Sequence, residues 1–141
     1  MSQIFDKQLY TPELKKTLQR IIELGYTATT TCELLTAAEF FKTLETVNVG
    51  LYIYVYTRFD TNPHEICRCN SIIEAINSQT PLPIPYIMPQ KLGDIPPVDG
   101  CHRMYVCEKL FAPDTKFPVL VLTTSKKPDE KEITYAKNRY N

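Results

Sequence analysis

The sequence of 141 residues predicts a mixed α/β fold, in which a small mixed sheet of about three to five strands packs with about three or four helices. Two observations predict this class: apolar residues recur at helical spacing after capping residues, and other apolar runs alternate or continue as strands do. A third feature is an extended proline-rich arm, residues 81–100. Since a chain of this length can bury about 70% of its unfolded surface around one core, residues 1–141 are expected to form a single domain.

The first predicted helix has local signals at both ends. Thr11 is in place as the N-cap, Pro12 takes the first helical position, and Gly25 ends the helix. Proline suits that position because its missing N–H would have no partner within the helix. One apolar stripe runs along the helix and consists of Leu14, Leu18, Ile21 and Ile22.

A second helix is predicted over about residues 37–47. Thr36 and Glu39 match a capping box, in which each side chain accepts a hydrogen bond from the backbone of the other residue. Apolar residues then recur at helical spacing, namely Phe40, Phe41, Leu44 and Val47. The threonine-rich segment YTATTT between the two helices is expected to be a turn or a short strand.

Strands are predicted next. LYIYVYT, residues 51–57, alternates aliphatic residues with tyrosines, which is the pattern of a strand with two different faces. EICRC, residues 65–69, is expected to return as its partner strand. Ser71 and Glu74 match another capping box and predict a short helix over IIEAIN.

The last third of the chain predicts two further strands and a final helix. RMYVCE, residues 103–108, alternates like a strand, and FPVLVLT, residues 117–123, is apolar without alternation, which indicates a strand covered on both faces. The final helix is predicted from its charges, because acidic residues favour a helix N-terminus and basic residues its C-terminus. The residues concerned are Pro128, Asp129, Glu130 and Glu132 in the first turn, and Lys137 and Arg139 near the end.

The proline-rich arm is the least usual segment. Proline fixes its own φ and biases the preceding residue toward extended backbone, so we expect neither a regular helix nor a central strand here. Large apolar side chains alternate with the prolines, and leaving each one in water would cost about 1.5 to 3 kcal/mol. They either pack on the chain's own domain or dock on another subunit, and we expect partner contacts from Leu82, Ile84, Tyr86, Ile87 and Met88.

A cluster of cysteine and histidine raises two chemical hypotheses. A structural zinc ion needs four ligands, and the best set would be His64, Cys67, Cys69 and Cys101, with Cys107 as the alternative to Cys101. If residues 101–107 form a strand, Cys101 and Cys107 lie about 20 Å apart and cannot share an ion. Buried free thiols explain the same residues without any cofactor.

The second hypothesis is a reactive thiol. Cys69 precedes the predicted helix at Ser71, where backbone N–H groups could lower the pKa of its thiol, and His64 is close in sequence. No local signature of a cysteine nucleophile accompanies these residues. A cysteine-dependent enzyme is therefore kept as a minor alternative.

Charge and motif content weigh against several classes. The formal net charge is zero, with 16 Lys and Arg against 16 Asp and Glu, whereas nucleic-acid binders usually carry a basic excess. Tyr52, Tyr54 and Tyr56 could stack bases on a strand face, so single-stranded nucleic acid stays an alternative ligand. HEICR lacks the second histidine of a zinc protease motif, and four glycines form no phosphate-binding loop.

Location is predicted from the apolar runs. The longest of these runs, LYIYVY and FPVLVL, are far shorter than the ~20 residues of a membrane span, so no membrane association is expected. The N-terminus MSQIFDKQLY lacks the apolar core of a secretory signal. We therefore expect a soluble intracellular protein, in the cytoplasm or the nucleus, with reduced thiols.

Two segments resemble a known family. LGYTATTTCELLTAAEFFKTLE and MYVCEKLFAPDTKFPVLVLTTSKKPDEKE are similar to the N-terminal jaw domain of the subunit shared by eukaryotic-type RNA polymerases. The shared features are a helix ending in Gly-Tyr, a helix carrying Glu-Phe-Phe, and an apolar strand before a proline-containing helix start. The C-terminal assembly domain of that family has no counterpart here, and the proline-rich arm does not match it.

The leading functional hypothesis is a non-enzymatic accessory or structural subunit that contacts a protein partner or a second copy through its proline-rich arm. The alternatives are a zinc-stabilised or single-stranded nucleic-acid-binding module, including an RNA polymerase jaw-like subunit, and a small cysteine-dependent enzyme.

Overall fold

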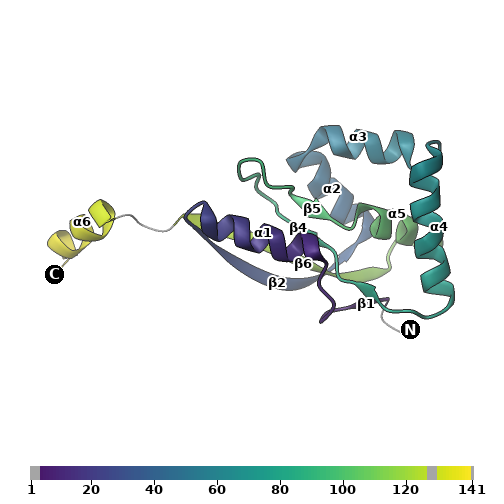
Figure 1. Ribbon diagram of the computed structural model, residues 1–141, viewed down its shortest axis with the longest axis horizontal. Coiled ribbons are helices and arrows are strands. Elements are labelled where there is room, and N and C mark those ends of the chain that lie inside the picture. The colour runs from purple at the N-terminus through teal and green to yellow at the C-terminus, as the bar shows by residue number, and fades with distance from the viewer. Residues whose placement is uncertain (1–3, 127–129, 141) are drawn as a thin grey trace.

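The mixed α/β class is confirmed by a computed structural model that describes residues 4–126 and 130–140 (Figure 1). The described residues form six helices, a two-stranded sheet and a four-stranded sheet. In chain order the elements are β1 Phe5–Asp6, α1 Pro12–Glu23, β2 Tyr26–Thr36, α2 Ala37–Val47, α3 Val49–Arg58, α4 Pro63–Asn77, β3 Leu82–Pro83, β4 Tyr86–Ile87, β5 Val98–Asp99, α5 Cys101–Leu110, β6 Lys116–Lys126 and α6 Glu130–Tyr140.

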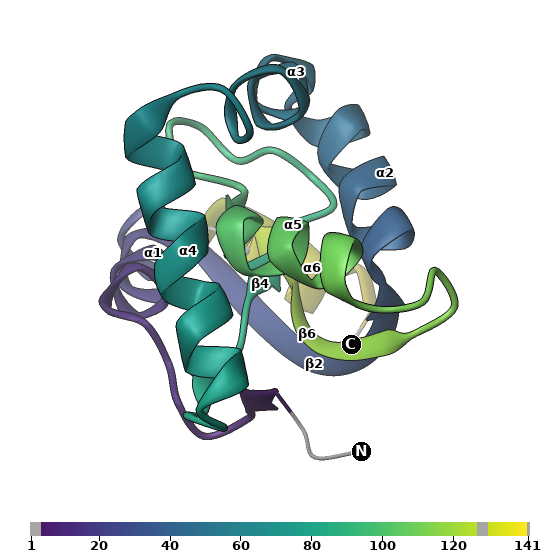
Figure 2. The same ribbon diagram turned by 90° about the vertical axis from the view of Figure 1, so that its right-hand side faces the viewer.

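The larger sheet is built around one long antiparallel ribbon. Its strand order is β2-β6-β4-β5, and β2 pairs with β6 over eleven residues, from Tyr26 opposite Lys126 to Thr36 opposite Lys116. β4 runs parallel to β6, and β5 runs antiparallel to β4. The ribbon curves along the lower side of the molecule, with α2, α3 and α5 above it (Figures 1 and 2). One edge of the sheet is therefore β2, and the opposite edge is β5.

The helices predicted near the N-terminus are confirmed. The Thr11 side chain accepts from the backbone N–H of Leu14 at the start of α1, and Thr36 and Glu39 form the capping box at the start of α2. The strand predicted over residues 117–123 is confirmed as part of β6, whose residues 117–122 are all buried. The segment YTATTT opens an eleven-residue strand, which is longer than the short element expected there.

Three predicted strands are wrong. LYIYVYT lies in α3, where the Asn48 side chain accepts from the backbone N–H of Leu51 and begins the helix. Tyr52 and Tyr56 come one helical turn apart, with ring centroids 5.0 Å apart, and Tyr56 also packs on Phe41. Packing thus overrides the β-propensity of the tyrosine and aliphatic side chains in this segment.

EICRC lies in α4, which runs continuously through the predicted short helix. Asn62 accepts from the backbone N–H groups of His64 and Glu65, and Pro63 takes the first helical position. Ser71, predicted as a cap, lies inside the helix and donates to the carbonyl of Cys67. RMYVCE lies in α5, most of whose residues are buried. Its alternation of apolar and polar residues therefore does not mark the two faces of a strand.

The arm is corrected in one respect. It is extended and forms β3, β4 and β5, but Tyr86 and Ile87 in β4 lie between β6 and β5, in the interior of the sheet. A central strand was expected to be excluded by proline. The carbonyl of Pro85 accepts a hydrogen bond from the N–H of Leu120, so the missing N–H of this proline is not required for the pairing. The two residues of β4 itself are not prolines.

The C-terminal helix is present as α6, with Lys137 and Arg139 in its last turn. The predicted first-turn residues Pro128 and Asp129 lie outside the described residues. α6 lies beyond the end of the β2–β6 ribbon, away from the other helices (Figure 1). In the described part of the chain, every helix is too short or too polar to cross a bilayer.

Candidate functional site

The four predicted zinc ligands lie on two helices and do not form a ligand set. His64, Cys67 and Cys69 lie on α4, and Cys101 begins α5. Two residues along a helix turn the side chain by about 200°, so Cys67 is exposed while Cys69 is buried. Among residues 4–126 and 130–140, no group of three or more His, Cys, Asp or Glu is arranged to hold a metal ion.

Cys101 and Cys107 lie closer together than a strand over residues 101–107 would place them. Both lie in α5, so six residues span about 9 Å along the axis instead of about 20 Å. Burial raises the pKa of the Cys101 thiol to about 12 and that of the Cys107 thiol to about 12. Both thiols are therefore protonated at neutral pH and pack as small apolar groups.

Cys69 does not have the surroundings of a nucleophile. It lies in the middle of α4 and not before a helix, so no free N–H groups of a helix N-terminus reach its sulfur. Burial raises the pKa of its thiol, and the charges of Glu65 and Asp60 raise it further. The thiolate that catalysis needs is disfavoured at this position.

The apolar side chains of the arm lie in the chain's own core. Ile84, Tyr86, Ile87 and Met88 are 0–1% exposed, and Leu82 is half-buried. The large side chains predicted as partner contacts are therefore covered mainly by this chain itself. Tyr52, Tyr54 and Tyr56 lie on α3 and not on a sheet, and the Tyr56 hydroxyl donates to the Glu108 carboxylate at 2.9 Å.

The structure forms instead a cleft, here called the α1 cleft, which the sequence did not predict. It lies between α1 and the segment 94–99 that leads into β5, with Tyr86 of β4 at its floor, and has a volume of about 330 Å³. Its lining combines apolar and charged groups from segments far apart in sequence: Glu13, Lys16, Thr17, Arg20, Tyr86, Asp94, Ile95, Pro96, Val98 and Asp99.

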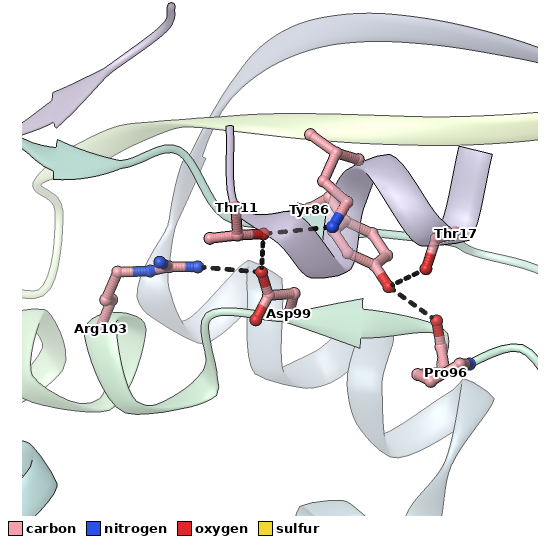
Figure 3. Close-up of polar contacts among 7 residues, drawn as sticks. Thr11, Thr17, Tyr86, Pro96, Asp99 and Arg103 are labelled. Carbon is pink, nitrogen blue, oxygen red and sulfur yellow. Dashed lines mark hydrogen bonds and ion pairs between the residues drawn. The ribbon is translucent and has the colours of Figure 1, made fainter. Parts of the chain in front are cut away.

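The polar groups at the floor of the α1 cleft are satisfied internally (Figure 3). The Tyr86 hydroxyl donates to the carbonyl of Pro96 at 3.0 Å and accepts from the Thr17 hydroxyl at 2.8 Å. Burial raises the pKa of Tyr86, while the hydrogen bond from Thr17 partly opposes this shift. Tyr86 is thus a neutral, fixed part of the floor.

Asp99 is held from two sides, as Figure 3 shows. It accepts from the Thr11 hydroxyl at 2.5 Å, and the Nη2 atom of Arg103 lies 3.4 Å away. Burial lowers the pKa of the Arg103 guanidinium, and the Asp99 charge opposes this shift. The Nε atom of Arg103 is buried without a hydrogen-bond partner in the described part of the chain. This network ties the start of α1 to the start of α5.

The sequence held part of the signal for this cleft. Lys16 and Arg20 are four residues apart on a correctly predicted helix, so they could have been placed on one face. The opposite wall could not be placed, because residues 94–99 belong to an arm without a regular period. The face of Tyr86 that meets α1 depends on the pairing of β4 with β6.

A second surface feature is the outer edge of β2. Residues 26–35 make no backbone hydrogen bond to any described segment other than β6. The side chains of residues 29–34 are exposed on both faces of the strand, and Leu34 is 60% exposed. The sheet therefore ends in a long row of backbone donors and acceptors that pair with no other segment in residues 4–126 and 130–140.

Comparison with known proteins adds no relative: no family model, no curated protein and no solved structure matches this chain.

Proposed function

We propose that this chain is a non-catalytic accessory or structural subunit that binds another protein chain by adding an extended segment of that chain to the edge of β2. The observation that carries the proposal is the open edge itself. It is eleven residues long, whereas strands average about 5–6 residues, and it lies at the end of a sheet with nothing covering it among the described residues.

The residue content of β2 supports the same proposal. Monomeric proteins protect such edges with lysine, proline or bulges, because an open edge is a template for further strand pairing. β2 has none of these, and Glu33 is its one charged residue. Five of its eleven residues are threonines, which favour extended backbone and pair well across strands.

The backbone contacts of an added strand give only weak binding by themselves. An added strand of about five residues would make about five hydrogen bonds, each with a net contribution of about 1 kcal/mol. The loss of translational and rotational freedom costs about 4 kcal/mol or more, so side-chain contacts must contribute the rest. Burying Leu34 would add about 1.5 to 3 kcal/mol. Together these contributions leave about 2.5 to 4 kcal/mol, which corresponds to a dissociation constant of about 1 mM or weaker. A micromolar complex therefore needs about 4 to 6 kcal/mol more from further side-chain contacts with the partner.

The α1 cleft supports the non-catalytic part of the proposal. The hydroxyls of Thr17 and Tyr86 and the carboxylate of Asp99 already have hydrogen-bond partners. A general acid or base needs a free side chain with a pKa near the working pH. Burial raises the pKa of Tyr86 and so moves it further from that range.

The proposal is tested with Thr29→Lys/Thr31→Lys, which places two charged side chains on the exposed edge. Gln19→Lys/Thr46→Lys is the matched control, because it adds the same charge at exposed positions of α1 and α2. Light scattering after size exclusion measures self-association, and co-purification from an extract of the source organism measures other partners. The wild type and the control should form the complex, and the edge variant should weaken it by about tenfold or more.

Hydrogen exchange supplies the second readout. In the free chain, β2 amides bonded to β6 should be protected and the outward-facing amides should exchange fast. The outward-facing amides should become protected in the complex. A wild type that forms no complex, or an edge variant that keeps every complex of the wild type, would contradict the proposal.

A further inference from the structure

The α1 cleft lies apart from the β2 edge, and none of its lining residues belongs to β2. Its volume of about 330 Å³ lies at the lower end of the range for small-molecule sites, which is about 300–1,000 Å³. Tyr86 and Ile95 at its floor are 1% and 2% exposed, and Val98 is 8% exposed. These side chains are almost fully covered and form a rigid apolar base, since Tyr86 is held by two hydrogen bonds. Pro96, which also lines the cleft, is exposed.

Two positively charged side chains of α1 line one wall of the α1 cleft. Lys16 and Arg20 lie one helical turn apart on α1 and both line the cleft. Lys16 has no hydrogen bond or ion pair within the described part of the chain. Arg20 lies 3.9 Å from Glu23 and 3.9 Å from Asp94, beyond hydrogen-bond distance, and its side chain is 47% exposed. Both side chains therefore have donors available for an anion.

The acidic groups of the α1 cleft are less available to a ligand. Asp99 is engaged by Thr11 and Arg103. Asp94 is 80% exposed at the rim, where water screens its charge, and it faces Arg20. Glu13 lies in the first turn of α1, where the helix dipole stabilises a carboxylate. Lys16 is thus a charged lining residue with no internal partner in the described part of the chain, and an anionic ligand group is complementary to it.

We propose that the α1 cleft binds a small carboxylic acid with a flat apolar body. The body lies against Pro96 and Val98, above the buried Tyr86 and Ile95. The carboxylate is directed toward Lys16 and Arg20. A carboxylate fits this pair because a guanidinium donates two parallel hydrogen bonds to its oxygens. The same chemistry is found in a free aromatic or aliphatic acid and in the C-terminal residue of a peptide, and the test separates these sources.

The probe is 3-phenylpropionate, titrated into the ¹⁵N-labelled full chain and followed by amide chemical shifts. Its neutral amide and 2-phenylethylamine are titrated in parallel as matched ligands of similar size. The acid should move the amides of α1 and of residues 94–99 with a dissociation constant of about 1 mM or below, as expected for a ligand of this size. The amide and the amine should bind about tenfold more weakly or not at all.

Two variants test the wall. Lys16→Gln/Arg20→Gln should weaken the binding of the acid by about tenfold or more and leave the binding of the neutral amide unchanged. Lys7→Gln/Lys15→Gln is the control, because it removes the same charge at exposed lysines that do not line the cleft. Retained dispersion of the amide spectrum shows that each variant is folded.

A tripeptide ending in phenylalanine with a free carboxylate identifies the source. Tighter binding of the peptide than of 3-phenylpropionate assigns a protein C-terminus, and the reverse order assigns a free acid; both outcomes support the proposal. The proposal is overturned if the acid moves no cleft amide up to about 10 mM, if the amide or amine binds as well as the acid, or if the Lys16/Arg20 variant binds like the wild type.

Discussion

The Asp99 carboxylate lies 3.4 Å from the Nη2 atom of Arg103, one turn further along the chain, and both side chains are mostly buried, at 23% and 11% exposed. Asp99 also accepts from the hydroxyl of Thr11, the N-cap of α1. The contacts of Asp99 connect two helices that are far apart in sequence, and Asp99 lines the α1 cleft. Its energetic role is open to direct measurement.

Asp99→Ala should lower the free energy of unfolding by about 2 to 4 kcal/mol, because it leaves the Arg103 guanidinium buried without its counter-ion. Arg103→Met should lower the free energy of unfolding by less than Asp99→Ala does, since Asp99 keeps its hydrogen bond from Thr11 and faces some solvent. Urea denaturation of both single variants and of the double variant gives the coupling energy. Simple additivity of the two effects would show that the pair is not coupled.

Gly100→Ala should destabilise the protein more than Gly25→Ala. Both glycines have positive φ, at 107° and 86°, which costs an alanine about 1 to 2 kcal/mol. At Gly100 the added Cβ would also lie 2.5 Å from the Cβ of Pro85 and 2.8 Å from Nη2 of Arg103, whereas at Gly25 it meets nothing within 4 Å. Thermal unfolding of the two variants checks this, and equal losses would contradict the steric argument.

His102 should make the protein less stable as the pH falls below about 6.5, the usual pKa of histidine. Burial lowers the pKa of His102 in the folded state, although its hydrogen bond to Glu65 at 3.1 Å partly opposes the shift. The unfolded chain therefore binds the proton first on acidification, so the free energy of unfolding decreases from that pH downward through the folded pKa.

The matched variant is His102→Gln, whose amide can still donate to Glu65. The difference in stability between neutral and mildly acidic pH should be smaller in this variant than in the wild type. An equal pH dependence in both proteins would assign the acid sensitivity to other groups.

The five cysteines should divide into two reactivity classes. Cys32 and Cys67 are exposed and should be alkylated by iodoacetamide at neutral pH at the rate of a free thiol, whereas Cys69, Cys101 and Cys107 are buried. Burial raises the pKa of each of these three thiols, so each should react at least about tenfold more slowly than the exposed cysteines. Mass spectrometry of the native and the denatured chain measures both classes. Fast labelling of Cys69 would restore the hypothesis of a catalytic thiol.

Local capping explains which helices the sequence predicted. The signals at Thr11, Pro12, Thr36 and Glu39 act on backbone groups within four residues, so they could be recognised without knowing the fold. The Asn62–Pro63 start of α4 is the same kind of signal and was available. Residues 65–69 were expected instead to pair with a strand over residues 51–57, and those residues lie in α3.

α3 and α5 could not be assigned from their patterns. Tyr56 contacts Phe41 and Tyr105, and six of the ten residues of α5 are buried, so neither helix shows a clear 3.6-residue apolar period. Alternating apolar residues in a helix that is covered on several sides look like a strand. The choice between the two conformations depends on neighbours that lie far away in sequence.

By itself the sequence determined the mixed α/β class, the two capped helices near the N-terminus and the buried strand β6, because caps and continuous apolar runs act over a few residues. Only the tertiary structure decided that the arm supplies the inner strand β4, that the predicted zinc ligands form no metal-binding group among the described residues, and that Lys16, Arg20 and Tyr86 line one cleft. These features depend on strand pairing and helix packing between distant segments, which no local pattern encodes.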